Sequence, residues 1–195
     1  GRTVTTPASP PTIDEFPAGP VLPLTLESPF TGLSDLVRGH AELRPEAPAL
    51  ADEQRRWTYA QLDGVANRIA AGLQQAGLKA GDSVGVCAAN SVLVAAVFVG
   101  VLRAGAVVVP LPTSLGAEGL TAMLADADAR WLFADAAGTA LVSAHENPSE
   151  RTVVGIDSDA GLEAWMPSVG TVPAPWHPTP EHPFNIIYSS GTTGT

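Results

Sequence analysis

The chain has 195 residues and a mass of 20.0 kDa, and 45% of the residues are hydrophobic. That content is enough for one domain with a sizeable core, or for one lobe of a larger protein, and it excludes an intrinsically disordered chain. The formal net charge of −10 makes the surface repel nucleic-acid phosphates, so a nucleic-acid partner is not expected.

The cysteine content and the apolar runs indicate the compartment. The one cysteine, Cys87, cannot form an internal disulfide, and we therefore expect a reducing, cytoplasmic location. The longest apolar run, residues 92–102, is about half of the roughly 20 residues that a membrane-spanning helix needs. No basic and then apolar pattern follows Gly1, so no signal peptide is expected.

The two ends of the chain differ in character. Residues 1–29 hold seven prolines and are expected to form an arm, apart from a domain over residues 30–195. At the other end the chain stops at Thr195, inside a Gly/Thr-rich loop that follows an apolar segment. Domains seldom end inside such a loop, so we expect a fragment of a longer protein whose remainder is a second chain or a cut partner.

Within residues 30–195 the apolar positions alternate between helical and strand periods. Thr58 and Gln61 form a capping-box pattern that begins one helix, Gly77 ends it, and Asn90 or Ser91 is expected to cap the next. Strands that are apolar on both faces, separated by helices, imply an α/β fold with a mostly parallel sheet that helices cover on both faces. The pattern predicts helices over residues 33–43, 58–77, 92–103, 118–127 and 137–145, and strands over 49–51, 56–58, 83–88, 106–111, 131–134, 152–156 and 184–188.

Two further segments are interpreted as surface. Residues 167–183 carry six prolines and are expected to form an ordered crossing over the surface or a linker. Asp126 and Asp128 lie near each other at a helix end, which favours a solvated face over an acid–base pair.

The loop after the last predicted strand carries the chemistry. A loop at the carboxyl end of a sheet strand lies where open α/β sheets bind ligands. Its glycines let the backbone approach a ligand, and its hydroxyls and amides suit phosphate oxygens and a phosphate-linked Mg²⁺. An ordinary Ser/Gly turn without a ligand is the alternative, and the Gly-Lys-Ser/Thr of a P-loop kinase is missing within the chain. The candidate residues are Ser189, Ser190, Gly191, Thr192, Thr193, Gly194 and Thr195.

Residues 188–195, YSSGTTGT, resemble the phosphate-binding signature of adenylate-forming (AMP-binding) enzymes: acyl-CoA synthetases, luciferases and the adenylation domains of peptide synthetases. Three further landmarks occur in the family's order. The resemblance covers roughly residues 33–195 and implies part of the large N-terminal domain of such an enzyme. The landmarks are residues 57–62 (WTYAQL), 80–84 (AGDSV) and 102–111 (LRAGAVVVPL).

The resemblance implies a carboxylate-activating ligase that uses ATP and Mg²⁺. The carboxylate attacks the α-phosphorus, pyrophosphate leaves, and a thiol of coenzyme A or of a carrier protein's pantetheine takes the acyl group. Residues 190–195 are then the contacts to the outer phosphates, with Thr192 and Thr193 near the metal, while Ser189 and Tyr188 aim the loop.

The family's loop lysine, its acyl pocket and its second catalytic lysine would lie beyond Thr195, so no catalytic residue is expected here. We expect this chain alone to bind ATP weakly and to catalyse nothing. The rival interpretation is a non-catalytic α/β interaction module.

Overall fold

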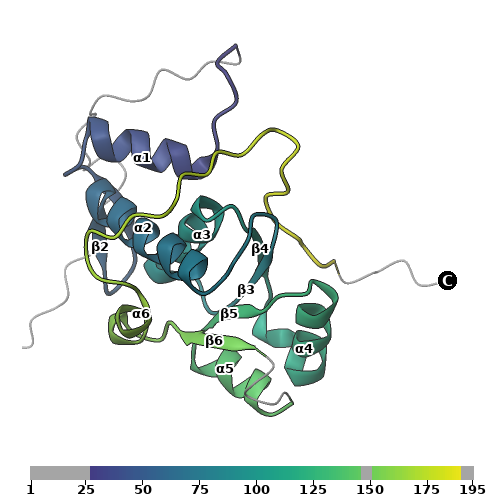
Figure 1. Cartoon of the computed structure of the whole chain (residues 1–195). Helices are drawn as coiled ribbons and strands as arrows, with labels where there is room; N and C mark the ends of the chain where they lie inside the picture. Colours follow the sequence, from purple (N-terminus) through teal and green to yellow (C-terminus); the bar gives the residue numbers. More distant parts are fainter. Residues whose placement is uncertain (1–26, 146–150, 190–195) are drawn as a thin grey trace, which may run out of the picture.

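The computed structural model describes residues 27–145 and 151–189 (Figure 1). The chain alternates helices and strands, as the sequence predicts. The helices are α1 (Leu33–Leu43), α2 (Tyr59–Gln75), α3 (Val92–Arg103), α4 (Gly116–Asp126), α5 (Ala136–Ser143) and α6 (Asp159–Trp165), with a 3₁₀ turn η2 (Thr113–Leu115). The strands are β1 (Pro48–Ala51), β2 (Arg56–Thr58), β3 (Ser83–Cys87), β4 (Val107–Pro110), β5 (Trp131–Ala134) and β6 (Thr152–Gly155).

The strands form two sheets. Strands β1 and β2 pair antiparallel, whereas β4, β3, β5 and β6 lie in that order in a parallel sheet. Parallel neighbours require crossover connections, and the helices supply them. The predicted parallel α/β sheet is therefore confirmed.

Hydrophobic side chains pack on both faces of the parallel sheet. Because successive strand residues point to opposite faces, Val108 lies in one cluster with α2 and α3, while Val109 lies in a second cluster with α4 and α5. Phe133 and Leu132 divide between the same two clusters. The prediction of helices on both faces is confirmed.

Local signals explain where the helices begin. The Thr58 side chain accepts a hydrogen bond from the backbone N–H of Gln61, and the Gln61 side chain accepts one from the backbone N–H of Thr58. The predicted capping box is therefore present. Of the two expected caps for α3, the structure uses Ser91, whose Oγ accepts from Val94 N at 3.2 Å. None of the described helices has the length and hydropathy that crossing a membrane requires.

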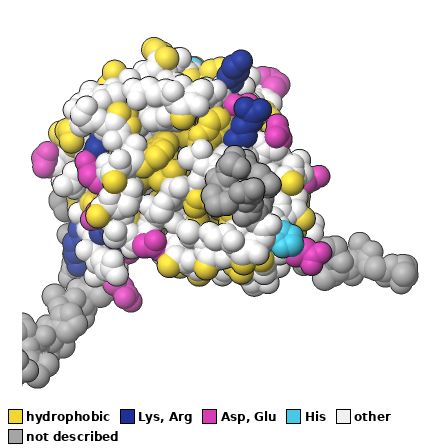
Figure 2. Space-filling view, turned by 60° about the horizontal axis from the view of Figure 1, so that its bottom comes forward, with side chains coloured by type: hydrophobic (Ala, Val, Ile, Leu, Met, Phe, Trp, Pro, Cys, Tyr) yellow, Lys and Arg dark blue, Asp and Glu magenta, His cyan; other side chains and the backbone are white. Residues whose placement is uncertain are grey.

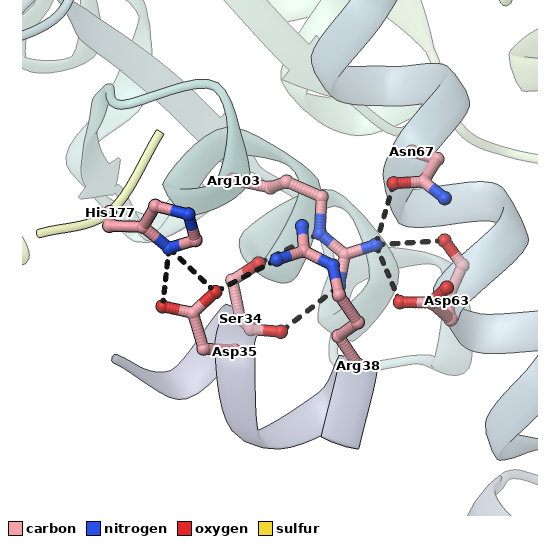
Figure 3. Close-up of polar contacts among 7 residues, drawn as sticks. All are labelled: Ser34, Asp35, Arg38, Asp63, Asn67, Arg103 and His177. Carbon is pink, nitrogen blue, oxygen red and sulfur yellow. Dashed lines mark hydrogen bonds and ion pairs between the residues drawn. The ribbon is translucent and has the colours of Figure 1, made fainter. Parts of the chain in front are cut away.

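A buried arginine joins the first three helices (Figure 3). The Arg103 side chain on α3 is 1% exposed and forms a 2.7 Å ion pair with Asp63 on α2. It also donates to Asn67 at 3.0 Å and to Ser34 Oγ on α1 at 2.8 Å. Burial lowers the pKa of Arg103, and the charge of Asp63 opposes that effect. A buried charge needs such partners, so this cluster fixes how α1, α2 and α3 sit together.

The proline-rich stretch after α6 crosses the surface, as predicted, and side chains hold it there. Arg68 on α2 donates to Pro167 O at 2.7 Å, and the Gln74 amide bonds both backbone groups of Ala174. The Trp176 ring lies over Gly105, where a Cβ would meet the ring at 2.9 Å. Gly105 has φ +85°, so both its backbone and the overlying ring require glycine.

The structure differs from the sequence prediction at two elements. The sequence pattern did not predict α6, a seven-residue helix with one buried side chain, Leu162. The strand predicted over residues 184–188 is instead an extended segment with one bridge, parallel, between Asn185 and Val108. A single β-bridge holds it against the outer edge of β4, which is too little pairing for a regular strand.

Candidate functional site

Most of the predicted phosphate loop lies outside the described residues. Ser190, Gly191, Thr192, Thr193, Gly194 and Thr195 belong to that part, so their roles remain predictions. Ser189 is described and exposed, and Tyr188 is partly buried. The structure therefore defines how the chain reaches the loop.

The segment before the loop runs along the edge of β4. Val108 N donates to Phe184 O at 3.3 Å, and Ile186 N donates to Val108 O at 2.9 Å. Since the bridge is parallel, the chain leaves this segment at the carboxyl end of the sheet. Open α/β sheets bind ligands at that end, so the segment brings Ser189 to that end of the sheet.

Tyr188 ties this segment to α4. Its hydroxyl donates to Asp126 Oδ2 at 2.7 Å and lies 3.2 Å from Met123 O. The hydrogen bond to the Asp126 carboxylate, with burial, raises the pKa of Tyr188 to about 12. Tyr188 and Ile186 also pack against the second hydrophobic cluster.

The contact of Tyr188 with Asp126 joins residues 62 positions apart. The sequence interpretation treated Asp126 as part of a solvated face. Asp126 is indeed exposed, but it also accepts the phenol. No spacing rule in the sequence signals a pair so far apart.

A cavity of about 470 Å³ lies at the carboxyl ends of β3, β5 and β6. Strands β3 and β5 are neighbours, yet the helices that follow them, α3 and α5, pack on opposite faces of the sheet. Such a switch point is a common ligand site in doubly wound folds. The lining residues are Asp52, Glu53, Gln54, Arg55, Ala88, Ala89, Asn90, Ser91, Leu93, Asp135, Ile156 and Asp157.

Two carboxylates of this cavity, Asp52 and Asp135, accept several hydrogen bonds from backbone N–H groups. Asp52 accepts from the N–H groups of Val92, Gln54 and Arg55 at 2.7–2.9 Å, and these bonds lower its pKa. Asp135 accepts from Ala89 and Gly138, both at 2.9 Å. These side chains therefore fix the β1–β2 turn and the starts of α3 and α5.

The described residues can also be searched for a metal centre and for a reactive cysteine. Within residues 27–145 and 151–189, no group of three His, Cys, Asp or Glu side chains is placed to hold a metal ion. Cys87 is buried, and burial raises the pKa of its thiol to about 11, so the thiol stays protonated at neutral pH and is a poor nucleophile.

The surface agrees with the acidic composition. Figure 2 shows one face of the molecule, on which hydrophobic side chains gather in a central hollow and charged side chains, mostly acidic, lie around it.

Comparison with known proteins shows which enzymes this chain is similar to in sequence. The chain is 34% identical over 156 residues to a fatty acid–[acyl-carrier-protein] ligase of Streptomyces coeruleorubidus, an alignment that covers 80% of this chain and 30% of the relative. It is 31% identical over 161 residues to the nonribosomal peptide synthetase vlms of a Lecanicillium species, covering 82% of this chain and 2% of the relative. The chain thus spans less than a third of these relatives.

A solved structure has the same arrangement. The N-terminal domain of FACL13 from Mycobacterium tuberculosis matches with a TM-score of 0.74 and 27% identity, covering 85% of this chain and 42% of that domain. The family model described as AMP-binding enzyme matches residues 37–195. This range agrees with the resemblance over residues 33–195, and the chain belongs to the AMP-binding enzyme family, the adenylate-forming enzymes.

Proposed function

We propose that this chain is the N-terminal portion of an ATP-dependent ligase that activates a carboxylic acid. A carboxylate oxygen forms a bond to the α-phosphorus of ATP. The bond from that phosphorus to the β-phosphate oxygen breaks, and pyrophosphate leaves with the electron pair. A thiol then takes the acyl group and AMP leaves. Family membership supports this reaction.

The observation that carries the proposal is the path of residues 184–189. This segment runs parallel to β4 and brings the chain to the carboxyl end of the sheet directly before the Gly/Thr-rich residues. Glycines there leave backbone N–H groups free to face an anion, and hydroxyls add donors around it. A turn in an interaction module would not require this placement.

We propose roles for the loop residues from the family signature. Ser190, Gly191, Thr192, Thr193, Gly194 and Thr195 would bind the β- and γ-phosphates of ATP, and the Thr192 and Thr193 hydroxyls would hold the Mg²⁺. The metal supplies neutralisation of charge on the phosphates when it is bound. Ser189 and Tyr188 set the direction of the loop.

The acceptor and the acid belong to the same proposal. A pantetheine thiol, on coenzyme A or on a carrier protein, is the acceptor, and the similarity to an acyl-carrier-protein ligase favours the carrier protein. The acid-binding pocket and the catalytic lysines are supplied by a C-terminal portion of the same enzyme. Residues 1–29 form a separate arm before a domain over 30–195, and one cysteine favours a cytoplasmic location.

ATP–pyrophosphate exchange tests the proposal. The full-length protein is assayed with labelled pyrophosphate over a panel of fatty, aromatic and amino acids, beside the 195-residue chain alone. We expect exchange with at least one acid for the full-length protein and none for the isolated chain. A well-folded full-length protein without exchange for any acid would favour the interaction module instead.

A further inference from the structure

We propose that Tyr188 is a positioning residue for the phosphate-binding loop, and that it acts through Asp126 on α4. The inference rests on the proposed function, because it assigns the Tyr188–Asp126 contact a part in nucleotide binding. Three features of the molecule support it: the point where the backbone attachment ends, the contact that the phenol makes, and the firm packing of α4.

The backbone attachment to the sheet ends before the loop begins. Among the described residues, the last backbone hydrogen bond between this segment and β4 is the one from Ile186 N to Val108 O. Ile187 points outward and is 71% exposed. Without another contact, three consecutive residues would separate the last anchor from Ser190, and the chain direction would be free to vary.

The phenol of Tyr188 supplies the missing anchor. It donates to a carboxylate at 2.7 Å, and hydrogen bonds to ionised acceptors are shorter and stronger than those between neutral groups. Its pKa of about 12 keeps the phenol a donor across the neutral range. The charged group that faces it is the Asp126 carboxylate.

Helix α4 is a firm support for this contact. Leu120 and Leu124 are 0% exposed and pack in the second hydrophobic cluster. Thr121 Oγ1 on the same helix donates to Ala117 O at 2.9 Å. Asp126 is itself exposed, but it lies at the end of a helix that the core holds in place, so its bond to Tyr188 fixes the start of the loop relative to that helix.

The consequence is specific to the nucleotide. A displaced loop loses alignment with the phosphates, and a shift of about 1 Å in a binding group can reduce a rate by about 100-fold. Loss of one anchor that leaves the fold intact should have a smaller effect. We expect the KM for Mg·ATP to rise by about tenfold, the size expected for the loss of one hydrogen bond to a charged group, with the KM for the carboxylic acid unchanged.

The experiment uses ATP–pyrophosphate exchange in the full-length protein. The variants are Tyr188→Phe, Asp126→Ala, Asp126→Asn and the double variant Tyr188→Phe/Asp126→Ala. Asp126→Asn keeps an acceptor oxygen for the phenol. Two matched controls change a distant tyrosine and a neighbouring aspartate: Tyr59→Phe, whose hydroxyl is 3.4 Å from Arg44, and Asp128→Asn at the exposed end of α4.

The inference predicts that Tyr188→Phe and Asp126→Ala each raise the KM for Mg·ATP and leave the KM for the acid unchanged. The double variant should have a KM for Mg·ATP no higher than that of either single variant. Asp126→Asn should raise this KM much less than Asp126→Ala does. Both controls should match the wild type. Equal rises in both KM values, with a lower melting temperature, would indicate a merely structural contact and overturn the inference. So would an unchanged Tyr188→Phe in an active enzyme. A wild type without any exchange would instead overturn the proposed function.

Discussion

Arg103 and Tyr188 each join elements far apart in the sequence, but in opposite surroundings. The Arg103 guanidinium is buried between three helices. Removing one of its partners there leaves a buried charge that neither water nor another group compensates. Tyr188 lies at the surface and joins one extended segment to the end of α4. The buried contact determines whether the helices assemble, whereas the surface contact determines where a segment points. Stability and nucleotide binding should therefore respond to different residues.

The largest expected effect comes from breaking the buried contact. Arg103→Met removes one member of the ion pair with Asp63 and leaves that carboxylate and the Ser34 backbone without their donor. We expect a loss of about 3 kcal/mol or more in the free energy of unfolding. Chemical denaturation measures it, with Arg38→Met as control, since Arg38 forms a partly exposed pair with Asp35 worth at most about 1 kcal/mol. Equal losses in both variants would contradict the comparison.

The packing beside Arg103 offers a second test. A Cβ on Gly100 of α3 would lie 2.6 Å from Ile69 on α2, whereas nothing lies within 4 Å of a Cβ on Gly64. Alanine favours a helix over glycine by about 1 kcal/mol, but overpacking costs about 1–3 kcal/mol. We expect Gly100→Ala to lower the melting temperature and Gly64→Ala to raise it. A higher melting temperature in both variants would contradict the close packing of α3 against α2 at Gly100.

The N-cap residues of α3 and α6 should have intermediate effects. Ser91 Oγ accepts from Val94 N at the start of α3, so Ser91→Ala should cost about 1 kcal/mol of stability. Ser158 has the cap position of α6 without a side-chain bond, and Ser158→Ala should cost less. Denaturation of both variants side by side checks this order.

The smallest effect belongs to the ion pair between Arg68 on α2 and the exposed Glu163 on α6. The hydrogen bond from Arg68 lowers the pKa of Glu163 below its ordinary value of 4.5. A carboxyl group with a lowered folded-state pKa stabilises fully above the unfolded value and loses that contribution as the pH falls through the folded value. The stability difference between wild type and Glu163→Gln should therefore be present at neutral pH and be lost progressively as the pH falls below 4.5 and through the lowered folded-state pKa. A difference that grew on acidification would have the wrong sign.

The sequence could predict elements that bury a full apolar face, such as α2 and α3, and the β3–α3 order that follows from them. It missed α6 because seven residues with one buried leucine give little periodicity. It overstated the strand at residues 184–188 because apolar residues at a sheet edge resemble a strand even when one bridge forms. The contact of Tyr188 with Asp126 depends on how α4 docks on the sheet, which no local pattern encodes.

The central claim is that the residues after Tyr188 bind the outer phosphates of ATP. A crystal structure of the full-length protein with Mg²⁺ and a non-hydrolysable ATP analogue tests it most directly. We predict β- and γ-phosphate oxygens about 2.7–3.2 Å from backbone nitrogens of residues 190–194, with Tyr188 still bonded to Asp126. Phosphates bound in the cavity between β3 and β5, without contact to those residues, would contradict the account.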